Sequence, residues 1–208
     1  MAATKSGAFP YGQAPYTYAG PALQKAWKRL HAGDREPFPD DAAVIEAWRA
    51  FHRGDFAAAI TQGARQGPPG ISAANKAAAV QASYLIDSDA RAVKLLQEAA
   101  QRADQAVRAA PDYANAWYFQ AFVLGRYAQR ISVVKALAEG VGGKVRKALE
   151  RTLELEPRHA VVAGDRKYGR KRSSEALGLE LGCRRVLLQE MCVRLELGRE
   201  QEGHRQHA

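Results

Sequence analysis

Apolar residues recur at helical spacing along most of this 208-residue chain. The clearest stretch predicts two amphipathic helices, over residues 113–130 and 144–156. Pro111 precedes the first helix and Pro157 follows the second, and the helix end, proline and helix restart around each proline share one register. A helix pair that restarts after a proline is typical of helical repeat proteins, in which no single unit buries its own apolar face.

Five further helices are predicted upstream of this stretch. Pro21 opens a short helix over residues 21–32, with its apolar residues on one face. Asp40 or Asp41 caps a second helix, which ends at Gly54. The other three predicted helices run from Asp55 to the Gly-Pro-Pro-Gly stop at 67–70, from Ser72 to about Ile86, and from residue 89 to Ala110.

The composition favours helices over strands. Hydrophobic residues make up 47% of the chain and aromatic residues only 8%, because much of the apolar content is alanine. Alanine is the best helix former, and its small side chain lets helices approach closely. Val, Ile and Thr do not alternate through a convincing strand before residue 160. We therefore predict an all-α fold of antiparallel helix pairs.

Three motifs carry a resemblance to a known repeat family. The joint GDFAAAI at 54–60 resembles the Gly-Asp-Tyr-x-x-Ala-Ile joint of tetratricopeptide repeats. Trp117, Ala121 and Leu124 resemble the large–small–large face of the first helix of that repeat, and ALERTLELEP at 148–157 resembles its second helix and closing proline. The resemblance covers about residues 41–160 and implies helix pairs stacked as a short right-handed superhelix, a tetratricopeptide-like α-solenoid.

The spacing of the prolines departs from the family. Pro111 and Pro157 are 46 residues apart, whereas a standard repeat takes about 34 residues. The surplus lies at 130–143, between the two helices of one unit. An elongated joint of this kind is similar to the divergent repeats of the regulator-of-microtubule-dynamics family and related bacterial proteins.

The last 48 residues break the repeat pattern, with three alanines against 38 in residues 1–160. In the register of the preceding unit, the next helix would bring Lys167 and Arg170 to buried positions, which is unfavourable for unpaired charges. A fourth repeat is therefore not expected, the domain should end near Ala160, and the tail should contribute little to the fold. We predict a flexible arm over 1–20, a repeat domain over 21–160, and an atypical basic tail over 161–208 that is partly disordered or forms a capping helix near 184–199.

Two origins of this tail stay open: a natural basic extension, or a foreign segment left by a frameshift, fusion or truncation. In the second case the exposed end of the array would promote self-association. Net charge is +9, which raises the alternative of binding to nucleic acid or an acidic partner through the tail. The residues of the basic run that would make this contact are Arg166, Lys167, Arg170, Lys171 and Arg172.

In the family, the inner helix of each unit lines a concave groove. On the 113–130 helix, the residues offset from the predicted core face are Asn115, Tyr118, Phe122 and Arg126. An aromatic pair flanked by an amide and a guanidinium suits peptide contact, although Tyr118 and Phe122 could equally pack on a neighbouring helix. Asn75 and Asn115 are the only asparagines, so the family's clamp for a C-terminal carboxylate is not supported.

No catalytic constellation, metal-ligand spacing or cofactor motif is apparent in the sequence. Neither an apolar signal segment nor a run of roughly 20 apolar residues is present, so a cytoplasmic protein without a membrane span is expected. We predict a non-enzymatic adaptor that binds a protein or peptide partner in its groove.

Overall fold

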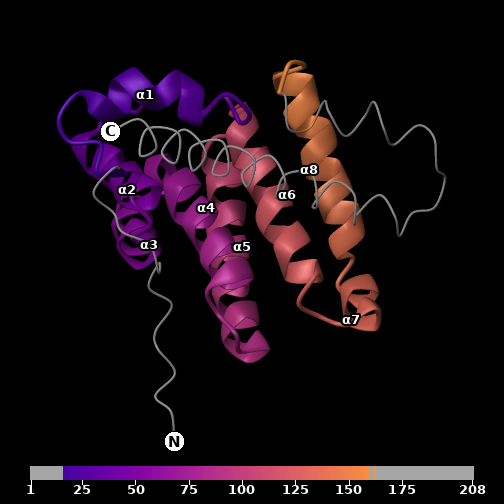
Figure 1. Cartoon of the computed structure of the whole chain (residues 1–208). Helices are drawn as coiled ribbons and strands as arrows, with labels where there is room; N and C mark the ends of the chain where they lie inside the picture. Colours follow the sequence, from indigo (N-terminus) through magenta and orange to yellow (C-terminus); the bar gives the residue numbers. More distant parts are fainter. Residues whose placement is uncertain (1–15, 160–161, 163–208) are drawn as a thin grey trace, which may run out of the picture.

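The computed structural model describes residues 16–159 and residue 162, and all regular elements in this part of the chain are helical. The predicted all-α class is therefore confirmed. The helices are α1 (Ala22–Leu30), α2 (Ala42–His52), α3 (Phe56–Arg65), α4 (Pro68–Tyr84), α5 (Asp89–Ala109), α6 (Ala114–Ala128), α7 (Val133–Ala138) and α8 (Val141–Leu155) (Figure 1). None of these helices is long and apolar enough to cross a membrane.

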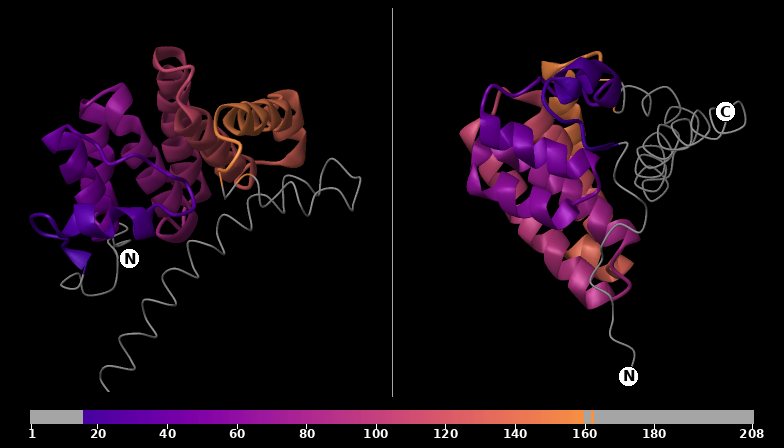
Figure 2. Two further views of the ribbon diagram at one scale, coloured as in Figure 1. Left: turned by 90° about the horizontal axis from the view of Figure 1, so that it is seen from above. Right: turned by 60° about the vertical axis from the view of Figure 1, so that its left-hand side comes forward.

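The helices pack in pairs, and the pairs lie side by side. α2 packs on α3, α4 on α5 and α6 on α8, as the paired spacing predicts. α2 also contacts α4, and α4 contacts α6, so these three helices form a continuous row (Figure 1). α1 lies across one end of this array (Figure 2). Its Trp27 ring meets the Trp48 ring of α2 edge to face, at 5.6 Å between centroids.

Aspartate and serine caps set the starts of three of the predicted helices. The Asp41 carboxylate accepts from the backbone N–H groups of Ala43 and Val44, at 2.7 and 3.2 Å. Asp55 and Ser88 cap α3 and α5 in the same way. These side chains satisfy N–H groups that have no partner within the helix, which is why these helices start where the sequence predicts.

Two boundaries differ from the prediction. α4 begins at Pro68, within the segment that was expected to be a stop. Gly67 takes φ +62° as the N-cap, and the two prolines fit the first turn because their missing N–H groups would have no partner there. In the surplus segment 130–143, Ser132 caps an additional helix, α7, before α8 starts at Val141.

Small residues let α3 and α4 cross closely. A Cβ atom on Gly70 would overlap the carbonyl oxygen of Gly63, and one on Gly63 would lie 2.6 Å from the carbonyl oxygen of Gly70. Ala74 packs at the same crossing and is fully buried. The alanine content therefore serves close helix packing, as the composition indicates.

The ends of the predicted domain are only partly described. Residues 1–15 of the predicted arm lie outside the described residues, whereas Tyr18 and Gly20 are bound to α2 through their carbonyl oxygens, which accept from Arg49. At the other end, Val162 is 4% exposed and belongs to the core. Because Val162 is the one residue of segment 161–208 that the structure describes, the expectation that this segment contributes little to the fold stays a prediction. The basic run 166–172 and the predicted capping helix 184–199 lie outside the described residues, and both stay predictions.

Candidate functional site

A group of buried polar side chains lies where the connection between α1 and α2 meets helices α4 and α6. We call it the polar cluster. Two carboxylates come from the connection, at Asp34 and Glu36, and both are less than a tenth exposed. The remaining members come from the ends of other elements or from helix faces: His31, Ser72, Lys76, Tyr113, Asn115 and His159. A buried polar group is costly unless it is paired, so these contacts decide how this end of the domain is built.

Asp34 is an ionised carboxylate held between two basic side chains. One oxygen lies 2.8 Å from Nζ of Lys76, and the other lies 2.9 Å from Nδ1 of His31. Burial alone would raise the pKa of Asp34, but the charges and hydrogen bonds of Lys76 and His31 outweigh it and hold this pKa well below its usual value. The same carboxylate accepts from the backbone N–H of Glu36 at 3.3 Å, which ties the two acids together.

Lys76 is buried among aromatic rings on α4. Its side chain is 8% exposed, and Nζ lies 5.4 Å from the ring centroid of Phe51 and 5.9 Å from that of Trp48. The rings and the carboxylate together stabilise a cation in this position. Ser72 lies one turn earlier, so both side chains leave α4 on the same face.

Glu36 is bound mainly by neutral donors. Nδ2 of Asn115 donates to Oε2 of Glu36 at 2.5 Å, and Tyr113 and Ser72 also form hydrogen bonds with this carboxylate. Burial, and then the nearby charge of Asp34, raise the pKa of Glu36 to about 7. Its backbone carbonyl accepts from Nε1 of Trp27 at 2.7 Å, which anchors the segment on α1.

His159 completes a relay of hydrogen bonds toward Glu36. Because Nδ2 of Asn115 donates to Glu36, its Oδ1 is the acceptor for Nε2–H of His159, at 3.0 Å. Burial lowers the pKa of His159 to about 4, so the ring is neutral with its proton on Nε2. The imidazole ring also packs on Tyr118, at 4.5 Å between centroids.

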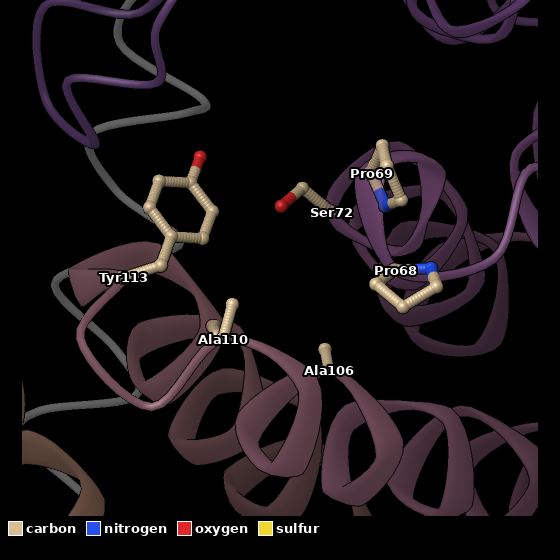
Figure 3. A pocket seen from close by; sticks show the side chains of 7 residues that line it. Pro68, Pro69, Ser72, Ala106, Ala110 and Tyr113 are labelled. Atoms are coloured by element: carbon tan, nitrogen blue, oxygen red, sulfur yellow. The ribbon is translucent and has the colours of Figure 1, made fainter.

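A small apolar pocket adjoins the polar cluster. Its volume is about 160 Å³. Figure 3 shows Ser72 and Tyr113 facing each other across the pocket, and the start of α4, the end of α5 and the start of α6 form the rest of its wall. The lining residues are Pro68, Pro69, Ser72, Ala106, Ala110, Tyr113 and Ala116. Ser72 and Tyr113 thus belong to both the pocket and the polar cluster.

The four residues predicted to contact a partner form one row along α6. Asn115, Tyr118, Phe122 and Arg126 are 3, 3, 7 and 2% exposed. Tyr118 stacks on Phe122 at 6.0 Å, and the guanidinium of Arg126 lies 5.2 Å from the Phe122 ring. These four side chains do lie along one line of α6, but they are buried. Their burial agrees with the alternative that they pack within the domain. Partner contact through these residues stays a prediction.

The predicted core face of α6 is only partly buried. Ala121 and Leu124 are buried, but Trp117 is half-buried, and its Nε1 donates to the carbonyl of Pro111 at 2.8 Å. α6 contacts α4, α5 and α8, so most of its circumference is buried. With neighbours on three sides, a single apolar stripe does not identify the buried face.

Sequence patterns did not reveal most of the polar cluster. Asp34 and Glu36 lie between two predicted helices, and His159 lies beyond the last one. Only Asn115 was singled out. Acidic residues in a short loop are usually solvated, so the structural role of these two acids is seen only from their partners on α4 and α6.

Among the described residues, no group of three or more His, Cys, Asp or Glu side chains could hold a metal ion.

No protein-family model, no curated protein and no solved structure matches the chain. The resemblance to tetratricopeptide repeats therefore rests on the three motifs in the sequence.

Proposed function

We propose that the chain is a non-enzymatic protein-interaction module of the tetratricopeptide type, which binds a peptide segment of its partner along the row formed by α2, α4 and α6. The helix contacts support this proposal, because α2 packs on α3 and α4, α4 packs on α5 and α6, and α6 packs on α8. Such an array offers side chains from successive units along one surface.

One observation carries the proposal: side chains from two successive units converge on a single stretch of chain without regular structure. Ser72 and Lys76 of the α4–α5 pair, together with Asn115 of the α6–α8 pair, surround the acidic residues of the connection between α1 and α2. Recognition of a peptide by a helical array requires this kind of convergence.

The test removes the basic group of this surface without leaving a buried charge. Asp34→Asn/Lys76→Met replaces both members of a buried ion pair, so the fold should persist. Partner proteins captured from cell extract by the immobilised full chain should be lost from this variant. The matched control is Arg146→Met/Glu150→Gln, which removes an exposed pair on α8. Equal capture by the folded double variant and the control would contradict the proposal.

A further inference from the structure

We infer that residues 34–36 occupy, within their own chain, a binding site for an acidic peptide whose two carboxylates are separated by one residue. The inference rests on the proposed function and names the chemistry of its partner. In this view the partner competes with the chain's own Asp34 and Glu36 for the side chains that hold them, which we call the receptor residues: Ser72, Lys76, Tyr113, Asn115 and His159.

The receptor residues belong to packed elements that are independent of the segment they hold. α4 and α6 contact each other and lie in the interior of the array, and Asn115 and His159 are almost completely buried. His159 orients Asn115, because the hydrogen bond from Nε2 to Oδ1 leaves the amide Nδ2 directed at the carboxylate of Glu36. Ser72, Lys76 and Asn115 are thus positioned by α4 and α6, which do not include the present occupant.

The two subsites differ in charge. Lys76 supplies a buried cation at the first subsite, where Asp34 is the carboxylate paired with it. A buried cation is strongly unfavourable without an anion beside it, so this subsite selects a carboxylate. The second subsite offers an amide and two hydroxyl groups to Glu36, and these bind an acid less strongly than a cation does. An acidic residue followed two positions later by a second acid fits both subsites.

The present occupant is held under strain. Arg35, between the two acids, takes φ +53°, a left-handed conformation that is unfavourable for a residue with a side chain. Its own side chain is half-exposed and reaches only to 3.8 Å from Glu156. Burial, and then the nearby charge of Asp34, raise the pKa of Glu36, which weakens the hold on Glu36 once it ionises. A free peptide is not joined to α1 and α2 at its two ends, as the chain's own segment is, so those helices do not hold it in this conformation.

The first experiment uses a fluorescent peptide with the sequence of residues 31–38, HAGDREPF, as the probe. Binding to the full chain is measured by anisotropy at low salt. In the variant Asp34→Asn/Glu36→Gln the chain's own segment loses both carboxyl groups and the receptor residues stay intact. This variant should bind the probe at least about tenfold more tightly than wild type does, because a larger fraction of molecules has an accessible site. High salt should weaken the binding.

Three controls test whether binding depends on the acids of the peptide and on Lys76. Asp87→Asn/Glu98→Gln removes two exposed acids elsewhere and should bind the probe as wild type does. A peptide with Asn and Gln in place of its two acids should not bind to any variant. Adding Lys76→Met to Asp34→Asn/Glu36→Gln should abolish probe binding. Equal affinity for the charged and neutral peptides, or no gain over wild type in a variant that circular dichroism shows to be folded, overturns the inference.

A second measurement covers the case in which the variant does not fold. Hydrogen exchange of segment 31–38 is followed in the wild-type chain while unlabelled peptide is added in excess. Exchange of the segment should increase with peptide concentration, and the neutral peptide should have no effect. Unchanged exchange at the highest concentration contradicts the inference. The proposed function would survive that result if partner capture is still lost in Asp34→Asn/Lys76→Met, because another segment of the partner would then be the ligand.

Discussion

The two sides of α4 are built on opposite principles. Toward α3, Gly70 and Ala74 lie against Gly63, and the crossing contains backbone and small apolar groups. Toward the connection between α1 and α2, Ser72 and Lys76 hold two buried carboxylates. The first side is stabilised by close packing and tolerates no added volume, whereas the second is stabilised by charge pairing and tolerates no missing partner. Substitutions that separate volume from charge should therefore affect the two sides differently.

The largest effect is expected for Lys76→Met, which should lower the free energy of unfolding by about 3 to 5 kcal/mol because it leaves Asp34 buried without its cation. Adding Asp34→Asn should recover a large part of this loss, since both members of the pair are then neutral. Urea denaturation of the two variants measures the difference. Arg146→Met, which breaks an exposed pair, should cost less than about 1 kcal/mol. A double variant no more stable than Lys76→Met would show that the pair is not what stabilises this side.

The next effect is a change in pH dependence. The pKa of Glu36 is raised to about 7 from 4.5, so its contribution to stability is present below pH 4.5 and is lost as pH rises through 7. The pKa of His159 is lowered to about 4 from 6.5, so its contribution is present above pH 6.5 and is lost as pH falls through 4. Between pH 4.5 and 6.5 the two slopes oppose each other.

In the variant Glu36→Gln, only the contribution of His159 to the pH dependence of stability should remain. The stability of this variant relative to wild type should be greater at pH 8 than at pH 5, by up to about 3 kcal/mol. Denaturation curves at pH 5, 6, 7 and 8 test this, with Glu98→Gln, an exposed acid, as the control. If Glu36→Gln and wild type have parallel pH profiles, Glu36 does not hold a proton in the folded chain.

On the apolar side, Gly70→Ala should cost about 2 kcal/mol, because the new methyl group would overlap the backbone of α3. Gly143→Ala on α8 is the matched control, since a Cβ atom there meets nothing within 4 Å. This control should be neutral or stabilising by up to about 1 kcal/mol. Thermal melts compare the two substitutions. Equal melting temperatures would mean that α3 and α4 are free to move apart.

The smallest effect is expected at the backbone of the acidic segment. Arg35→Gly should raise the free energy of unfolding by about 0.5 to 1 kcal/mol, because glycine takes the left-handed conformation without a clash. Arg35→Ala keeps the strain and serves as the control. A loss of stability in Arg35→Gly larger than in Arg35→Ala would show that the segment is not strained.

The sequence by itself determined seven of the eight helices in the described part of the chain, and most of their ends. Asp41, Asp55 and Ser88 cap helices because their side chains bond to backbone groups only two or three residues away, and such local chemistry is visible in any single sequence. The pairing of α6 with α8 followed from their apolar spacing. The prolines at the start of α4 were assigned to a stop, because proline suits both a stop and a first helical turn.

Only the tertiary structure decided which polar residues are buried together. Asn115 lies 79 residues from Glu36 along the chain, and His159 lies 44 residues from Asn115, yet one chain of hydrogen bonds joins them. No spacing rule connects positions so far apart. The pKa values of Glu36 and His159 depend on burial, which arises only when α1, α4 and α6 pack around the segment. The sequence supplied the helices, and their packing created the polar cluster, since long-range contacts set both the pairing and the loss of solvent.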